Sequence, residues 1–263
     1  MAATLKRVAE PRIDCSPEEW SLRVDLVCAY RVVAHMGWHQ MIYNHLTARV
    51  PGPGHQFLIN PFGLMYREVT ASNLIRIDAE GNKLSPSPHP VLQAGFIVHR
   101  SVHMNRPDVG AVMHSHSVAG VAVACQAEGL LPLNLNSMVF HDRIAYHDLE
   151  GITLDTSESE RIAASLGLKN VMILRNHGLL TCGASIAEAF SDLYHLETAC
   201  QIQIAAQSSG ARLGYPPDAL SRHTAMQRYE EDGSTKARVL EQYGILWAAM
   251  KRWMREISPG FDA

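Results

Sequence analysis

Gly110-Ala111-Val112-Met113-His114-Ser115-His116, residues 110–116, is an apolar run that becomes polar at its end. Such a run predicts a buried β-strand. Because side chains at positions i and i+2 of a strand point to the same face, His114 and His116 should project side by side. Two neutral imidazoles in that arrangement can bind one divalent cation, although two exposed or hydrogen-bonded histidines at a strand end fit this segment as well.

A second short apolar run, Val171–Leu174, leads into Asn176-His177-Gly178. We expect a buried strand followed by a polar turn, in which Gly178 lets the backbone turn sharply or approach a neighbour closely. Alone, this segment favours a capping or loop histidine. Taken with the first segment, it predicts a three-histidine metal site of His114, His116 and His177, with open coordination positions for substrate oxygens or water.

Apolar residues recur at helical spacing in several other parts of the chain. They predict helices over residues 20–36, 91–104, 118–127, 157–166, 186–207 and 234–257. Ser16 and Pro17 fit the start of the first helix, and Gly37 fits its end. Between the last two helices, we expect a less regular tail.

Short β-like runs occur at residues 45–50, 56–59 and 74–78, the first two separated by a Pro-Gly-Pro-Gly turn, and residues 128–155 are rich in loops. Strands and helices alternate irregularly, which indicates an α/β or α+β protein with one central sheet flanked by helices. We expect an N-terminal arm (1–20), one domain (21–207) and a C-terminal helical extension (208–263) that packs on the domain or on a neighbouring subunit.

Composition excludes several classes of protein. Of the 263 residues, 47% are apolar and 19% are charged, which is typical of a globular protein and not of a disordered one. A net charge of −3 argues against a nucleic-acid partner, and no stretch is apolar enough for a membrane span or a secretion signal. Five widely spaced cysteines without a CxxC pair indicate reduced thiols, so we expect a cytoplasmic protein. The open coordination positions of the predicted metal site indicate a small-molecule substrate.

The order of the histidine segments resembles the class II aldolase/adducin family over residues 25–205. The resemblance is carried by Asn105-Arg106-Pro107-Asp108-Val109, the His114-Ser115-His116 segment, and Asn176-His177-Gly178, with His99 also matching. It implies a three-layer α/β fold with a central, mostly antiparallel sheet flanked by helices on both faces. It also implies a divalent metal, most often zinc but also manganese or iron, and a homo-oligomer, usually a tetramer with metal sites near the subunit interfaces.

The sequence departs from the aldolases of this family where they hold phosphate and move protons. Their acid/base Glu falls on Gly95, and the serines before it are replaced by Gln93 and Ala94. By correspondence we expect four substrate-binding residues: Asn44, Gly63, Gln93 and Asn136. Because a phosphate dianion needs several directed donors, the loss of these hydroxyls predicts a substrate without phosphate.

Other residues near the ligand strands are candidates for proton transfer. Tyr146 and His147 lie in the loop-rich stretch and could donate or accept protons near a metal, although ordinary loop roles fit them equally well. His45 is expected at the surface or in a hydrogen bond, and His99 and His103, four residues apart on one helix, are expected to be structural.

Three functions are compatible with this pattern. The first is a divalent-metal-dependent lyase, a decarboxylase or an aldolase, acting through a metal-bound enolate on a small non-phosphorylated carbonyl or hydroxy-acid. Because decarboxylation needs no base to take a hydroxyl proton, the missing Glu favours it over aldol cleavage. The alternatives are a three-histidine Fe(II) oxygenase or isomerase, and a non-catalytic, adducin-like interaction module.

Overall fold

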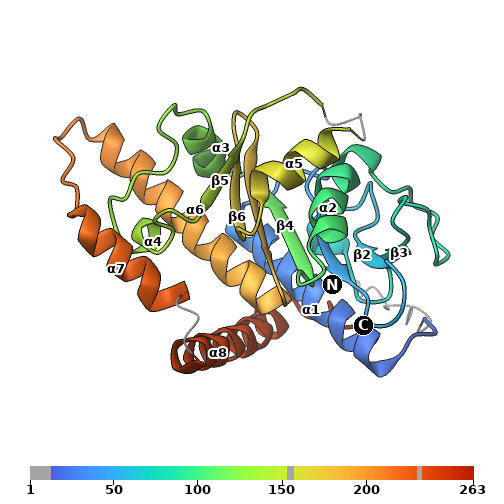
Figure 1. Ribbon diagram of the computed structural model, residues 1–263. Coiled ribbons are helices and arrows are strands. Elements are labelled where there is room, and N and C mark those ends of the chain that lie inside the picture. Colours follow the sequence, from blue (N-terminus) through green and yellow to red (C-terminus); the bar gives the residue numbers. More distant parts are fainter. Residues whose placement is uncertain (1–12, 153–156, 230–232) are drawn as a thin grey trace, which may run out of the picture.

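The computed structural model describes residues 13–152, 157–229 and 233–263, so most of the expected N-terminal arm lies outside the described residues (Figure 1). The described chain forms one seven-stranded sheet in the order β3-β2-β1-β4-β7-β6-β5. The strands are β1 (Leu46–Arg49), β2 (Phe57–Ile59), β3 (Ile75–Ile77), β4 (Ala111–Ser115), β5 (Ile144–His147), β6 (Val171–Leu174) and β7 (Gly178–Gly183). β5 and β6 pair in parallel, and the other neighbours are antiparallel, as the mostly antiparallel sheet predicted by the family resemblance requires.

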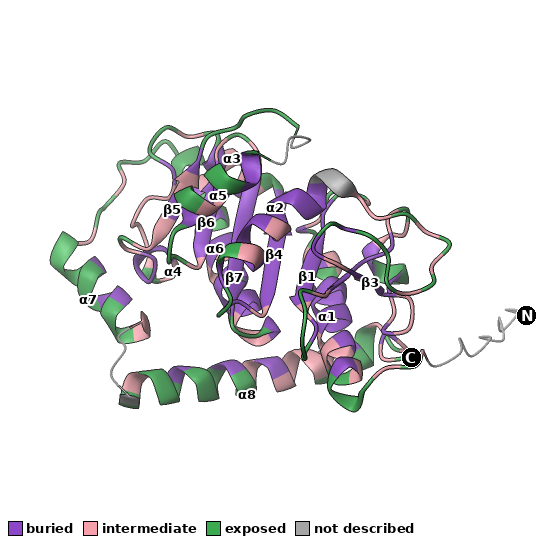
Figure 2. Ribbon diagram, turned by 45° about the vertical axis from the view of Figure 1, so that its right-hand side comes forward, coloured by how far each residue is buried: buried purple, intermediate pink, exposed green. Residues whose placement is uncertain are grey.

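Helices cover both faces of this sheet, which confirms the three-layer α/β class. The helices are α1 (Pro17–Met36), the 3₁₀ turn η1 (Tyr66–Glu68), α2 (Gln93–Asn105), α3 (Val118–Ala124), α4 (Leu135–Met138), α5 (Glu158–Leu166), α6 (Ile186–Ser208), α7 (Asp218–Tyr229) and α8 (Gly233–Ile257). α1, α6 and α8 share one core with β1 and β4, and α2 and α5 share another with the central and last strands. Figure 2 shows the strands buried and the outer faces of α7 and α8 exposed.

The alternation of side chains along β4 decides where its polar end points. Ala111 and Met113 belong to the core under α1 and α6, whereas Val112 belongs to the core under α2 and α5. By the same two-residue period, His114 follows Val112 to the α2 face and Ser115 follows Met113 to the α6 face. One strand thereby delivers a histidine to one side of the sheet and a hydroxyl to the other.

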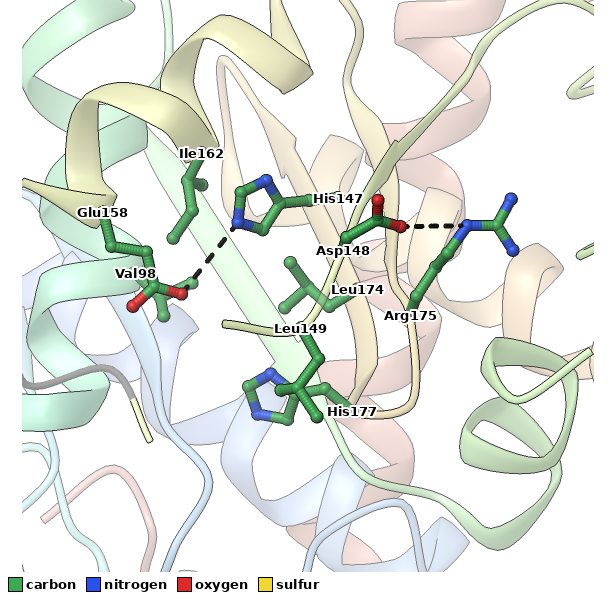
Figure 3. A pocket seen from close by; sticks show the side chains of 9 residues that line it. All are labelled: Val98, His147, Asp148, Leu149, Glu158, Ile162, Leu174, Arg175 and His177. Carbon is green, nitrogen blue, oxygen red and sulfur yellow. Dashed lines mark ion pairs between the residues drawn. The ribbon is translucent and has the colours of Figure 1, made fainter. Parts of the chain in front are cut away.

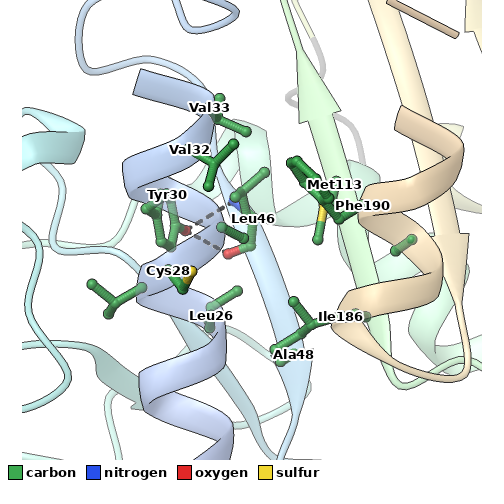
Figure 4. Close-up of a cluster of buried hydrophobic side chains, with 14 of the residues drawn as sticks. Leu26, Cys28, Tyr30, Val32, Val33, Leu46, Ala48, Met113, Ile186 and Phe190 are labelled. Atoms are coloured by element: carbon green, nitrogen blue, oxygen red, sulfur yellow. Dashed lines mark hydrogen bonds between the residues drawn. The ribbon is translucent and has the colours of Figure 1, made fainter. Parts of the chain in front are cut away.

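The largest core lies between α1, α6 and the strands β1 and β4 (Figure 4). Leu26 and Phe190 are fully buried there, and each such side chain contributes about 1.5–3 kcal/mol through burial. Tyr30 is also fully buried, and its hydroxyl accepts a hydrogen bond from the Leu46 amide (2.9 Å) and lies 2.5 Å from the Leu46 carbonyl. This pairing fixes α1 to the start of β1, directly beside His45.

Several expected elements differ in extent from those observed. The helix expected over residues 118–127 ends at Ala124. Residues 178–183 form strand β7 where only a turn at residues 176–178 was expected, and residues 218–229 form α7 where a less regular tail was expected. α8 packs on α1 and α6, with Trp247, Met254 and Phe261 in the main core. None of the described helices combines the length and apolar character needed to cross a bilayer.

Candidate metal centre

His114, His116 and His177 converge at the end of β4. Their ring centroids are 4.5 Å apart for His114 and His116, 4.8 Å for His114 and His177, and 4.7 Å for His116 and His177. One potential ligand nitrogen from each ring lies within 4.8 Å of the other two, and no other group of this kind occurs among the described residues. The structure therefore brings together the three histidines that the sequence singles out.

The hydrogen bonds of two of these rings fix which nitrogen carries the proton. His114 Nδ1 lies 2.8 Å from the Leu179 carbonyl oxygen, and His116 Nδ1 lies 2.8 Å from Gln40 Oε1. Both partners are acceptors, so each Nδ1 carries the hydrogen and each Nε2 carries a lone pair. The two Nε2 atoms nevertheless face each other at 2.7 Å. A divalent cation bound to both nitrogens would satisfy these lone pairs, and neutral imidazoles are the donors that zinc and related divalent metals accept.

Protonation is a poor alternative to a metal here. Burial lowers the pKa of His116 to about 3, with the neighbouring histidines adding to the effect. Burial also lowers the pKa of His114 well below its ordinary value and that of His177 to a smaller degree. At neutral pH the three rings are therefore uncharged and available as ligands.

Two backbone features hold His177 against the other rings. Asn176 has a left-handed conformation (φ 58°), which turns the chain sharply after β6 and directs His177 back towards β4. Gly178 then lies so close to β4 that a Cβ there would meet the Ser115 carbonyl oxygen at 2.4 Å and His116 Cδ2 at 2.8 Å. Glycine is required at this position because the backbone passes directly beside the ligands.

A layer of hydrogen bonds supports the ligands from behind. Asn44, one of the expected substrate-binding residues, is buried, and its Oδ1 accepts from the Gln40 amide (2.5 Å). Gln40 in turn binds His116, so Asn44 shapes the loop that orients a ligand. The other amide atom of Asn44, Nδ2, is buried without a partner in the structure.

On the other face of the sheet, Glu197 of α6 anchors the strand end. Its Oε1 accepts from Ser115 (2.5 Å), and its Oε2 accepts from Ser117, which also caps α3. Ser115 and Ser117 flank His116, so the carboxyl group fixes the backbone on both sides of that ligand. Burial raises the pKa of Glu197 to about 7, against the opposing effect of the two hydroxyls.

His45 is not at the surface, which corrects the expectation from the sequence. It is 4% exposed, with its ring 4.5 Å from His99 and 5.8 Å from His114. His99 and His103 are fully buried, and both bond to Thr47 Oγ1, at 2.6 and 2.8 Å. Their contacts fit the structural role expected for them.

The two expected proton-transfer residues take opposite faces of β5. His147 lies on the α5 side, where its Nδ1 is 3.0 Å from Ser165 Oγ, and it shares a cavity of about 10 Å³ with His177 (Figure 3). Tyr146 lies on the other side, where its hydroxyl accepts from the Leu130 amide (3.2 Å) and its ring packs under Arg175. The structure therefore brings His147, but not Tyr146, towards the centre.

The remaining expected substrate-binding residues are dispersed. Asn136 Oδ1 is bonded to His195 Nδ1 (2.9 Å) on α6. Gly63 is exposed in a turn with φ 104°, and no atom lies within 4 Å of a Cβ built there. Gln93 begins α2, but its side chain lies outside the described part of the structure.

Sequence reasoning missed Gln40 and Glu197. Gln40 lies in a loop without a recognisable motif, so no signal pointed to it. Glu197 lies on a helix that was expected, in the stretch Tyr194-His195-Leu196-Glu197, and its place next to Leu196 gives little hint of burial.

Comparison with known proteins gives consistent matches. The family model described as Class II Aldolase and Adducin N-terminal domain matches residues 24–204. A Pseudomonas aeruginosa protein whose name places it in aldolase class 2 is 42% identical over 261 residues, 99% of each chain. Alpha-adducin of Mus musculus is 44% identical over 186 residues, which are 70% of this chain and 25% of the adducin. The crystal structure of an aldolase II superfamily protein from Pseudomonas syringae, 43% identical, has a TM-score of 0.86, covering 95% of this chain and 98% of that one.

Proposed function

Because the chain belongs to the class II aldolase and adducin family, we propose that it is a divalent-metal-dependent carbon–carbon lyase acting on a small, non-phosphorylated carbonyl or hydroxy-acid substrate. The observation that carries this proposal is the pair of unprotonated Nε2 atoms of His114 and His116, which face each other at 2.7 Å with His177 beside them. Such an arrangement is costly in a protein that binds no cation at this point.

His114, His116 and His177 would hold the cation through one nitrogen each. A divalent cation in this site supplies Lewis-acid polarisation of substrate oxygens. The chain itself orients the rings through Leu179 and Gln40 and keeps them neutral by burial. His116 and His177 are only partly buried, so a small molecule can approach the three rings from their exposed side.

The residues around the centre favour decarboxylation over aldol cleavage. In aldol cleavage a base must remove the hydroxyl proton as the C–C bond breaks. Decarboxylation releases CO₂ and leaves the electron pair on the substrate without any such base. Among the described residues, the candidate ligands His114, His116 and His177 are accompanied by no carboxylate. His147 lies near them only through the small cavity that it shares with His177. We propose His147 as the donor of the proton that the product carbon takes up.

Product analysis on metal-loaded protein tests the proposal. Purified protein, incubated with a panel of 3-oxo acids and 4-hydroxy-2-oxo acids, should release CO₂ from the former, or an aldehyde from the latter if aldol cleavage occurs. A variant in which His114 and His116 are both alanine should release neither and bind no metal. Stable metal uptake by the wild type without either product from the panel would contradict lyase activity.

Two alternatives remain open to the same experiments. An Fe(II) oxygenase or isomerase predicts iron after anaerobic purification, with oxygen uptake in the case of the oxygenase. A non-catalytic interaction module is suggested by the 44% identity to alpha-adducin, although the chain covers only a quarter of that protein. It predicts that the double alanine variant keeps all cellular function.

The family resemblance also suggests how the chain assembles. We propose a homotetramer, with the centre close to a subunit interface. Val118, two residues after His116, is 89% exposed, and we propose that the interface covers it. Analytical ultracentrifugation should find a species of four chains, and a monomer at micromolar concentration would overturn this part. The cytoplasmic location stays a prediction.

A further inference from the structure

The ring of His45 fills the space next to Gly95 at the start of α2. A Cβ at position 95 would lie 2.1 Å from His45 Cε1 and 2.5 Å from both ring nitrogens. No real side chain tolerates such contacts, so any residue other than glycine at 95 would displace the imidazole. Gly95 has no left-handed backbone conformation, and the reason for glycine here is therefore space and not chain geometry.

By the family resemblance, position 95 is the one on which the acid/base Glu of the aldolases falls. In this chain, the volume of that side chain is taken by an imidazole that comes from a different element, the residue directly before β1. The exchange replaces an anionic group by one that is uncharged at neutral pH, because burial lowers the pKa of His45 to about 4. A neutral imidazole offers one N–H donor and one acceptor, whereas a carboxylate offers acceptors only.

His45 faces the centre, and neither of its ring nitrogens has a hydrogen-bond partner of good geometry in the structure. Its ring lies on the same side of the sheet as His114, 5.8 Å away, and within electrostatic reach of His116 and His177. The backbone at Gly95 and Tyr43 counters only part of the effect of burial on the pKa of His45. The neighbouring His99 is already committed through Nδ1 to Thr47.

A buried polar nitrogen without a partner costs free energy, and a ligand that satisfies it recovers this cost on binding. Gly95 and His99 of α2 lie against one side of the ring, and His114 lies 5.8 Å away on the side of the three histidines, where a ligand could supply the partner. An anionic oxygen is the strongest acceptor for an imidazole N–H, and the departing or remaining carboxylate of an acid substrate supplies one.

We propose that His45 is a substrate-binding residue that donates a hydrogen bond to an anionic oxygen of the substrate held over the three histidines, and that the substrate is therefore a carboxylic acid. This inference rests on the proposed function. It narrows the substrate to acids that carry a carbonyl able to take up the electron pair of the broken bond, such as 3-oxo acids and 4-hydroxy-2-oxo acids. It also makes Gly95 the residue that admits the imidazole.

Oxalate is the probe, because it is a small dianion that combines two oxygens for a cation with others for His45. Its affinity for the zinc-loaded protein is measured by calorimetry for the wild type and for His45→Leu, His45→Gln and Gly95→Ala. Bound zinc is measured in each sample, and circular dichroism shows whether each variant folds. His103→Gln is the matched control, because His103 is equally buried but stacks on Phe57, away from the three ligands.

We expect His45→Leu to weaken oxalate about tenfold while zinc content stays at the wild-type value. His45→Gln, which keeps an N–H donor, should weaken it less, and Gly95→Ala should resemble His45→Leu because it displaces the ring. The control should bind oxalate like the wild type. If His45→Leu does not fold, the oxalate affinities of His45→Gln and Gly95→Ala test the proposal in its place.

Oxalate affinity that is equal in the wild type and all folded variants would overturn this inference and leave the proposed function intact. Wild-type protein that binds zinc but not oxalate would overturn it as well. Wild-type protein that takes up no metal would instead overturn the proposed function, and this inference with it.

Discussion

Gly178 gives the sharpest test of the centre at the scale of single residues. In Gly178→Ala, the new Cβ would lie 2.4 Å from the Ser115 carbonyl oxygen and 2.8 Å from His116 Cδ2, so β7 or the ligand ring must move. We expect zinc affinity to fall about 10- to 100-fold, the range seen when groups that orient metal ligands are disturbed. Competition with a chromophoric chelator measures this affinity.

Gly214→Ala is the matched control for that substitution. Gly214 has no atom within 4 Å of a built Cβ and no left-handed conformation, so the same chemical change there should leave zinc affinity unaltered. If the two alanine variants bind zinc equally well, close packing of Gly178 against the ligands has no role in metal binding.

Glu197 predicts a pH dependence of stability with a defined sign. Its pKa is about 7 in the folded chain and near 4.5 when unfolded, so the folded state binds the extra proton between these values. The group therefore stabilises the fold below about pH 4.5, and this contribution is lost as the pH rises to 7. The loss amounts to about 3 kcal/mol.

Urea unfolding of metal-free wild type and Glu197→Gln across pH 4.5 to 8 measures this effect as a difference. The difference is needed because the buried histidines, whose pKa values are lowered, act in the opposite direction in both proteins. Wild type should lose stability relative to Glu197→Gln as the pH rises. Parallel curves for the two proteins would show that Glu197 has an ordinary pKa.

The candidate ligands could be predicted from sequence because each depends on short-range geometry. His114 and His116 share a face through the period of a strand, and His177 follows directly from another buried strand. Glu197 and His45 depend instead on how distant elements pack. The register of α6 against β4 decides that Glu197 meets Ser115, and the closeness of α2 to β1 decides that His45 is buried.

The helices and strands with a clear hydrophobic period were predicted to within a few residues. β7 and α7 were missed because their sequences lack such a period. β7 is buried on both faces, so Gly178–Gly183 shows no alternation of polar and apolar residues. α7 is mostly exposed, with three residues (Ser221, Thr224 and Ala225) buried in the described part, so it shows no apolar stripe.

α8 carries a prediction at the scale of the element. Trp247 is 5% exposed, and its ring lies 5.4 Å from that of Phe190 in the main core. If α8 is an integral part of the domain, Trp247→Ala should lower the free energy of unfolding by about 3–5 kcal/mol, the usual cost of removing a large core aromatic.

Ile245, on the same helix, is 64% exposed and provides the control. Ile245→Ala should change the free energy of unfolding by less than about 0.5 kcal/mol. Equal effects of the two substitutions, or none from Trp247→Ala, would mean that α8 adds little to the stability of the domain.

For the whole molecule, the centre joins elements that are far apart in the sequence, which couples metal binding to folding. His114 lies in β4 and His116 directly after it, His177 follows β6, and Gln40 comes from the loop after α1. An unfolded chain cannot bring these groups together, so a cation binds the folded state far more tightly and shifts the unfolding equilibrium.

Thermal unfolding with and without metal measures this coupling. Free zinc at about 100 times its Kd should stabilise the fold by about 2.7 kcal/mol and raise the Tm by roughly 5–10 °C, and EDTA should reverse the shift. The variant with alanine at His114 and His116 should unfold at the same temperature under both conditions, because its zinc site has been removed. A shift of equal size in both proteins would show that zinc acts at another site, and the absence of any shift in the wild type would show that the three histidines bind no metal.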